Sequence, residues 1–165
     1  DYTMGASKQV DPAEEHAAEL LLPFKRDLKS ALVAGMANGA DAAIDACKLE
    51  APAIAERLSI DGVAVGRTSH RLRNPANAPR EWVTPILKEY LAGEDEWQPR
   101  VVELGAGRSG YVEPIQLQPL CLNCHGETLA PEVVRRLDEL YPQDAATGFE
   151  VGDLRGVFWV EFPTP

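Results

Sequence analysis

Residues 121–125 read Cys-Leu-Asn-Cys-His, which is the attachment pattern of a c-type haem. Two thiols at this spacing can each form a thioether with a vinyl group on the same edge of a porphyrin. The adjacent His125 then reaches the iron as the proximal ligand, because its backbone is tethered at the rim of the ring. The pattern predicts one covalent haem c, attached through Cys121 and Cys124, with His125 on the iron.

Two other chemistries use a similar pair of thiols. A zinc site would need two further ligands at comparable spacing, and no second Cys-x-x-Cys occurs in the chain. A thioredoxin-like redox pair would stand at the start of a helix, directly after a buried strand, whereas here Pro119 precedes the motif and Gly126 follows it. Haem attachment is the interpretation that the spacing favours.

Length and charge limit the remaining possibilities. The chain has 165 residues, which suits one domain with a sizeable core over residues 11–165, after a polar and flexible tail at 1–10. A net charge of −10 disfavours nucleic acid and anionic membranes as partners, because no basic excess is available to neutralise phosphates. No apolar run approaches the ~18 residues of a spanning helix, so we expect no membrane segment.

The haem motif also predicts a location. Haem is attached to such motifs on the outer side of energy-transducing membranes, so we expect a periplasmic or otherwise exported protein. The sequence shows no signal peptide, because its first residues have neither a basic start nor an apolar core. We therefore expect a mature form, or a chain from which a leader or an anchor has been removed.

Apolar periodicity and turn residues predict the elements that position the motif. Helices are expected at 11–36, where Asp11 caps and Pro23 bends the helix, at 41–58, at 81–90 and at 131–140, with Val133, Val134, Leu137 and Leu140 of the last facing inward. Strands are expected at 63–69, 101–104, 110–115 and 157–162, the middle two joined as a hairpin. The pattern predicts an α+β fold, with helices over one face of an antiparallel sheet.

An ordinary class I cytochrome c does not fit this pattern. Those proteins carry the motif near the N-terminus and supply a methionine ligand later in the chain. Here both methionines, Met4 and Met36, precede residue 121, and strands make up much of the second half.

Six separated segments instead resemble the family of Tll0287-like haem domains. They fall within roughly residues 15–162 and read ACKLEAPAIA (46–55), VGRTS (65–69), RNPANAP (73–79), LCLNCHG (120–126), YPQDAATG (141–148) and GDLRG (152–156). The resemblance implies a PAS-like fold, in which helices flank a central antiparallel sheet and a c-type haem occupies the pocket. Members occur as stand-alone exported proteins and as sensory domains, with roles inferred as redox or small-gas sensing.

The resemblance also implies a second axial ligand. The family uses the cysteine of a Cys-x-x-x-Ala-Pro stretch, and Cys47 stands at that position. Cys47 is also the cysteine left over once the haem motif is formed, and helical spacing places it on an apolar face with Ile44 and Ile54. The alternatives are a buried cysteine that acts as a small hydrophobe, or a sixth ligand supplied by His70, Met36 or water.

Two arginines match family motif positions and could hold the haem propionates. Arg67 and Arg73 each carry a guanidinium group, whose paired donors suit a carboxylate. The alternative is that they are solvated charges at the end of a strand.

These residues predict a redox or diatomic-gas sensor that responds to nitric oxide or carbon monoxide. An electron-transfer cytochrome with a redox partner protein is the main alternative. A weaker alternative is haem enzymology, such as peroxide or nitrogen-oxide chemistry, for which His70 is the distal acid–base candidate. The sequence shows no catalytic constellation beyond the haem, so an enzyme is not expected.

Overall fold

The computed structural model describes residues 11–45, 50–73, 77–93, 97–117 and 129–165. Its helices are α1 (Pro12–Ala37), α2 (Ala40–Asp45), α3 (Ala51–Leu58), α4 (Thr84–Leu91) and α6 (Pro131–Leu140). Its strands are β1 (Ala64–Thr68), β2 (Arg100–Gly105), β3 (Arg108–Gln116) and β4 (Leu154–Pro163). The predicted α+β class is confirmed, and the tail predicted at 1–10 lies outside the described residues. Within the described residues, no helix is both long and apolar enough to cross a membrane.

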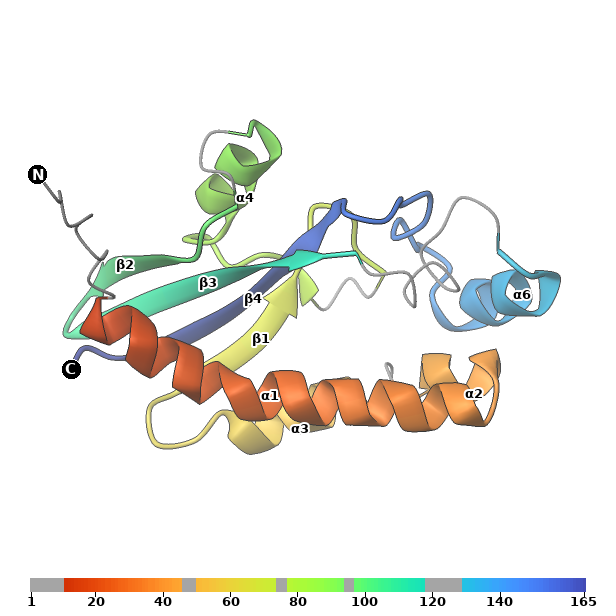
Figure 1. Ribbon diagram of the computed structural model, residues 1–165, viewed down its shortest axis with the longest axis horizontal. Coiled ribbons are helices and arrows are strands. Elements are labelled where there is room, and N and C mark those ends of the chain that lie inside the picture. Colours follow the sequence, from red (N-terminus) through yellow and green to blue (C-terminus); the bar gives the residue numbers. More distant parts are fainter. Residues whose placement is uncertain (1–10, 46–49, 74–76, 94–96, 118–128) are drawn as a thin grey trace, which may run out of the picture.

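The four strands form one antiparallel sheet in the order β1-β4-β3-β2. The predicted hairpin is confirmed: β2 and β3 pair across a turn in which Gly105, Ala106 and Gly107 all have positive φ. The last strand of the chain, β4, lies between β1 and β3, with Val160 opposite both Val65 and Tyr111. The sheet therefore places β4, its last strand in the chain, next to β1, its first (Figure 1).

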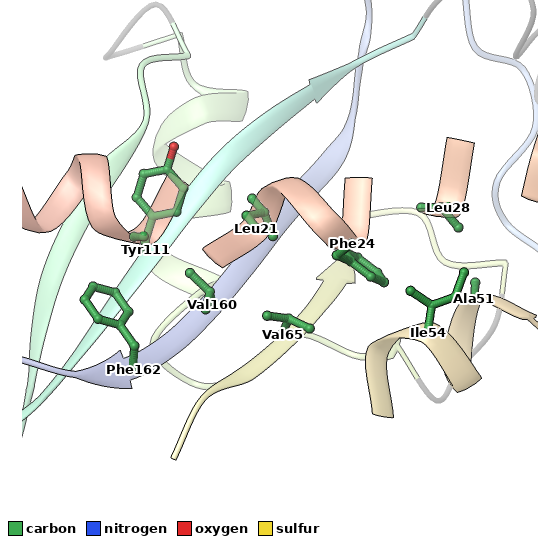
Figure 2. Close-up of a cluster of buried hydrophobic side chains, with 10 residues drawn as sticks. Leu21, Phe24, Leu28, Ala51, Ile54, Val65, Tyr111, Val160 and Phe162 are labelled. Carbon is green, nitrogen blue, oxygen red and sulfur yellow. The ribbon is translucent and has the colours of Figure 1, made fainter. Parts of the chain in front are cut away.

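The helices α1 and α3 cover one face of the sheet (Figure 1). Figure 2 shows the apolar cluster between these helices and the sheet, in which Leu21 and Phe24 of α1 approach strand residues such as Val160. The buried members are Ala17, Leu21, Phe24, Leu28, Ala51, Ile54, Val65, Tyr111, Val160 and Phe162. Burial of this face fixes α1 along the sheet.

The opposite face is covered by α4, so the prediction that helices cover one face is wrong for this helix (Figure 1). Ile86 and Tyr90 of α4 pack in one cluster with Val157 and Trp159 of β4. The reason lies in β4, whose successive side chains point to opposite faces and are apolar on both. A central strand of this composition needs cover on each side.

The first helix begins where its capping residues predict. The Asp11 carboxylate accepts a hydrogen bond from the backbone N–H of Ala13 at 2.9 Å, and Pro12 occupies the first turn, where a helix needs no N–H donor. The helix continues through Pro23 to Ala37. Its C-terminal part runs beyond the sheet towards α2 (Figure 1).

Two details of the predicted helices differ in the structure. Of the helix expected over 41–58, α2 and α3 are described, and residues 46–49 between them lie outside the described residues. The one apolar face expected along it is divided between two clusters: Ile44 packs with α6, and Ile54 packs with α1 and the sheet. Pro52 lies in the first turn of α3, where proline starts a helix more readily than it bends one. In α6, Val134 is 42% exposed because it lies one residue off the stripe formed by Val133 and Leu137.

Candidate functional site

The predicted haem residues Cys121, Cys124 and His125, and the predicted ligand Cys47, lie outside the described residues. The structure does describe the segments that lead into and out of them. These flanking segments show which parts of the fold the four residues are attached to.

The chain that enters the Cys-x-x-Cys-His segment is anchored at Leu117, four residues before Cys121. Its N–H donates to the carbonyl of Asp153 at 2.9 Å, and its carbonyl accepts from the N–H of Gly152 at 2.9 Å. The side chain is 2% exposed and packs with Ala146 and Phe149. The approach to the motif is therefore held by the loop that precedes β4.

The chain that leaves the motif is held against α2. Leu129, four residues after His125, packs against a cluster in which Val133, Leu137 and Tyr141 meet Ile44 of α2. At the edge of this cluster, Arg136 Nη2 donates to Asp45 Oδ1 at 2.7 Å. Asp45 lies two residues before Cys47, so the segment after the haem motif contacts the segment that leads into Cys47.

The other side of α2 is pressed against α1. A Cβ atom at Gly35 would lie only 2.8 Å from Cα of Ala43, a distance that real side chains do not reach. Glycine lets the two helix backbones approach closely here. The helix α2 is therefore set between α1 and α6.

Arg67 lies on the face of the sheet that α1 and α3 cover. It is two residues after Val65 of that apolar cluster, and it stands directly opposite Phe158, whose ring meets Phe24 of α1 edge-on at 5.7 Å. The side chain is half-buried, and it forms no ion pair with any residue that the structure describes. Its guanidinium group is thus a half-buried cation without a described counter-charge.

Arg73 has partners of its own. Its Nε donates to Asp144 Oδ1 at 3.1 Å and its Nη2 donates to the carbonyl of Ala146 at 3.1 Å. Both side chains of the ion pair are 11% exposed, so the alternative of a solvated charge does not hold for Arg73. The pair fastens the loop after β1 to the loop after α6, and a propionate contact at Arg73 stays a prediction.

We expect Arg73→Gln to lower the free energy of unfolding by about 2 kcal/mol, because it leaves the largely buried Asp144 carboxylate without its cation. Arg57→Gln is the matched control, since Arg57 pairs with Asp27 at 2.5 Å while its own side chain is 62% exposed. This control should cost less than about 1 kcal/mol. Urea unfolding followed by circular dichroism measures both. Equal costs for the two variants would contradict the structural role of Arg73.

His70, a rival sixth ligand, is exposed and meets the ring of Phe149 edge-on at 6.1 Å. Partial desolvation lowers the pKa of His70 from its usual value, and the charges of Arg71 and Arg155 lower it further, while Asp153 opposes them. The imidazole is therefore neutral at neutral pH. Its described contacts are with the loop before β4.

Sequence reasoning missed the residues that join the flanking segments. Asp45 and Arg136 are 91 positions apart and Arg73 and Asp144 are 71 apart, so no local pattern pairs them. Gly35 gave no signal either, because a glycine within an apolar helical stripe does not reveal the helix that packs on it. Asp144 does fall within one of the segments that resemble the family.

A long helix laid along an antiparallel sheet, with a Cys-x-x-Cys-His pattern between β3 and α6, defines a class of α+β domain with a haem-attachment sequence. The family model Tll0287-like (Tll0287) matches residues 6–163. The chain therefore belongs to the Tll0287-like family, as its segments predicted.

One solved structure, the "Crystal structure of the cyanobacterial heme-protein Tll0287", is similar to this chain with a TM-score of 0.66. The similarity covers 94% of this chain and 98% of that chain, at 22% sequence identity. At this identity the comparison shows a shared fold. No curated protein matches this chain.

Proposed function

We propose that the protein is an exported c-type haem protein, with a PAS-like fold, that senses redox state or a diatomic gas. Cys121 and Cys124 would attach one haem covalently and His125 would bind its iron. Two thiols and an adjacent imidazole are the donor set that this attachment requires. The similar cyanobacterial structure is that of a heme-protein, which supports a haem here as well.

One observation carries the proposal: the contact between α2 and α6. Ile44 lies three residues before Cys47, Leu129 lies four residues after His125, and both side chains belong to the same packed cluster. A chain spans at most about 3.5 Å per residue. Cys47 and His125 are thus joined by short chain lengths to one region of the fold, as two ligands of one iron must be.

Cys47 is proposed as the second axial ligand. A haem iron held by imidazole and thiolate supplies a one-electron centre whose ferric state is favoured. Loss of the thiolate on reduction would free the segment that follows α2, and this provides the two states that a sensor needs.

Arg67 is proposed to hold a haem propionate. It is half-buried on the helix-covered face and has no counter-charge among the described residues. A bidentate guanidinium group matches a carboxylate. Arg73 is the weaker choice for the same role, because Asp144 already pairs with it.

We propose no catalytic role, and the weaker alternative is peroxide or nitrogen-oxide chemistry at the haem. The proposed partners are a gas ligand or a redox protein, and neither nucleic acid nor a membrane surface suits the acidic chain.

Absorption spectra of the ferric and ferrous protein, with and without carbon monoxide, test the proposed function. A sensor should be six-coordinate and low-spin when ferric, and it should change coordination or bind carbon monoxide when reduced. Spectra of a six-coordinate iron in both the ferric and the ferrous protein, unchanged by carbon monoxide, would contradict sensing and indicate an electron carrier. His70→Gln is the control for the rival ligand, and its spectra should match those of the wild type.

A further inference from the structure

We infer that the ion pair between Asp45 and Arg136 is a positioning contact, which holds α2 against α6 and thereby keeps Cys47 on the iron. The inference rests on the proposed function, in which Cys47 is an axial ligand. It assigns to Asp45 and Arg136 a role in ligand retention rather than in haem attachment.

The geometry of the pair is that of a bridge between two helices. Arg136 Nη2 lies 2.7 Å from Asp45 Oδ1, and the two side chains are 31% and 41% exposed. The same guanidinium group has a second carboxylate, with Nη1 at 3.3 Å from Glu139 Oε2. Glu139 lies on α6 itself, so of these two carboxylates only Asp45 ties α6 to another helix.

The helix α2 depends on its neighbours. It has six residues, and a helix this short does not persist in water without tertiary contacts. On one side Gly35 brings the backbone of α1 against Ala43. On the other side Ile44, 3% exposed, packs on α6, and the Asp45–Arg136 pair closes the edge of that contact.

The two supports have different consequences for Cys47. The α1 contact holds the middle of α2, whereas the ion pair holds its last residue, two positions before Cys47. Loss of the ion pair leaves the middle of the helix packed but releases the end that leads to the ligand. We therefore expect the protein to stay folded while Cys47 leaves the iron more often.

The rate of alkylation of Cys47 tests this directly in the haem-loaded, ferric, full-length protein. The chain has three cysteines, and two are consumed by thioether bonds, so one thiol remains for iodoacetamide. We expect Asp45→Asn to be alkylated about threefold to fivefold faster than the wild type, as expected for loss of one partly exposed ion pair. Glu139→Gln, the matched control, should react at the wild-type rate.

The exchanged pair, Asp45→Arg with Arg136→Asp, is made together with Glu139→Gln, so that the new carboxylate at position 136 meets no second carboxylate on α6. It should restore the wild-type rate, because it rebuilds the bridge with its charges reversed. If circular dichroism shows that Asp45→Asn does not fold, Arg136→Gln is used in its place. This variant breaks the same bridge from the α6 side. Mass spectrometry counts the alkylated cysteines in each variant.

Three outcomes would overturn the inference: a wild-type rate in the variant that breaks the bridge, an equal acceleration in Glu139→Gln, or no recovery in the exchanged pair. If mass spectrometry finds one alkylated cysteine per chain, none of these three outcomes contradicts the proposed haem attachment. Alkylation of all three cysteines in the wild type is a different result, since it removes the proposed function itself.

Discussion

Replacing Cys47 with alanine is expected to abolish the low-spin thiolate spectrum of the ferric protein and leave the haem covalently attached. Alanine has no donor atom, whereas Cys121, Cys124 and His125 still provide the thioethers and the proximal ligand. The reduction potential should rise, because the thiolate that favours the ferric state is gone. The ferric variant should bind cyanide or water in the freed position, and the ferrous variant should bind carbon monoxide more tightly than the wild type.

Two control variants make this result specific. Met36→Leu and His70→Gln remove the rival ligands, and their ferric spectra should equal that of the wild type. An unchanged low-spin thiolate spectrum in Cys47→Ala would show that the ligand is another residue. A matching loss in His70→Gln would identify the imidazole as the sixth ligand.

Gly156→Ala is expected to have the largest effect on stability. A Cβ atom at this position would lie 2.2 Å from the backbone carbonyl of Thr68 and 3.1 Å from Cβ of Ser69. The obstacle is backbone at the junction of β4 with β1, so it cannot move aside as a flexible side chain could. We expect a loss of about 3 kcal/mol or more in the free energy of unfolding.

Gly107→Ala is the matched control for that loss. Gly107 lies in the hairpin turn with φ at +74°, and nothing lies within 4 Å of a Cβ atom built there. Alanine should therefore cost only about 1 kcal/mol, from backbone strain alone. Urea unfolding followed by circular dichroism compares the two variants. A loss at Gly156 no larger than the loss at Gly107 would contradict the close approach of β4 to β1.

The sequence was a sufficient guide where the signals are local. Asp11 and Pro12 predicted the start of α1, Pro131 predicted the start of α6, and the glycine-rich turn predicted the β2–β3 hairpin, because caps and turns act within a few residues. The central position of β4 depends on pairing with strands distant in sequence. The spacing of residues predicted a helix at 81–90, but it did not predict which strands pair with β4 or that α4 covers the second face of the sheet.

The same division holds for the site. Five consecutive residues, 121–125, predict the haem and its proximal ligand, because covalent attachment needs only local chemistry. The contacts that support this segment come from elsewhere in the chain, as Leu117 with Asp153 and Arg136 with Asp45 show. The sequence predicted the same role, propionate binding, for Arg67 and Arg73. The structure distinguishes them, because Arg73 pairs with Asp144 and Arg67 has no counter-charge among the described residues.

The central claim is that Cys121 and Cys124 bind haem covalently, and the mass of the denatured, exported protein tests it most directly. We predict a mass equal to the polypeptide plus one haem, retained after acid–acetone extraction, and a peptide spanning 121–125 that carries the haem. The variant with both Cys121→Ala and Cys124→Ala should have the polypeptide mass alone, whereas Cys47→Ala should keep the haem. A wild-type mass equal to the bare polypeptide, from cells that attach haem to a control c-type cytochrome, would contradict the proposal.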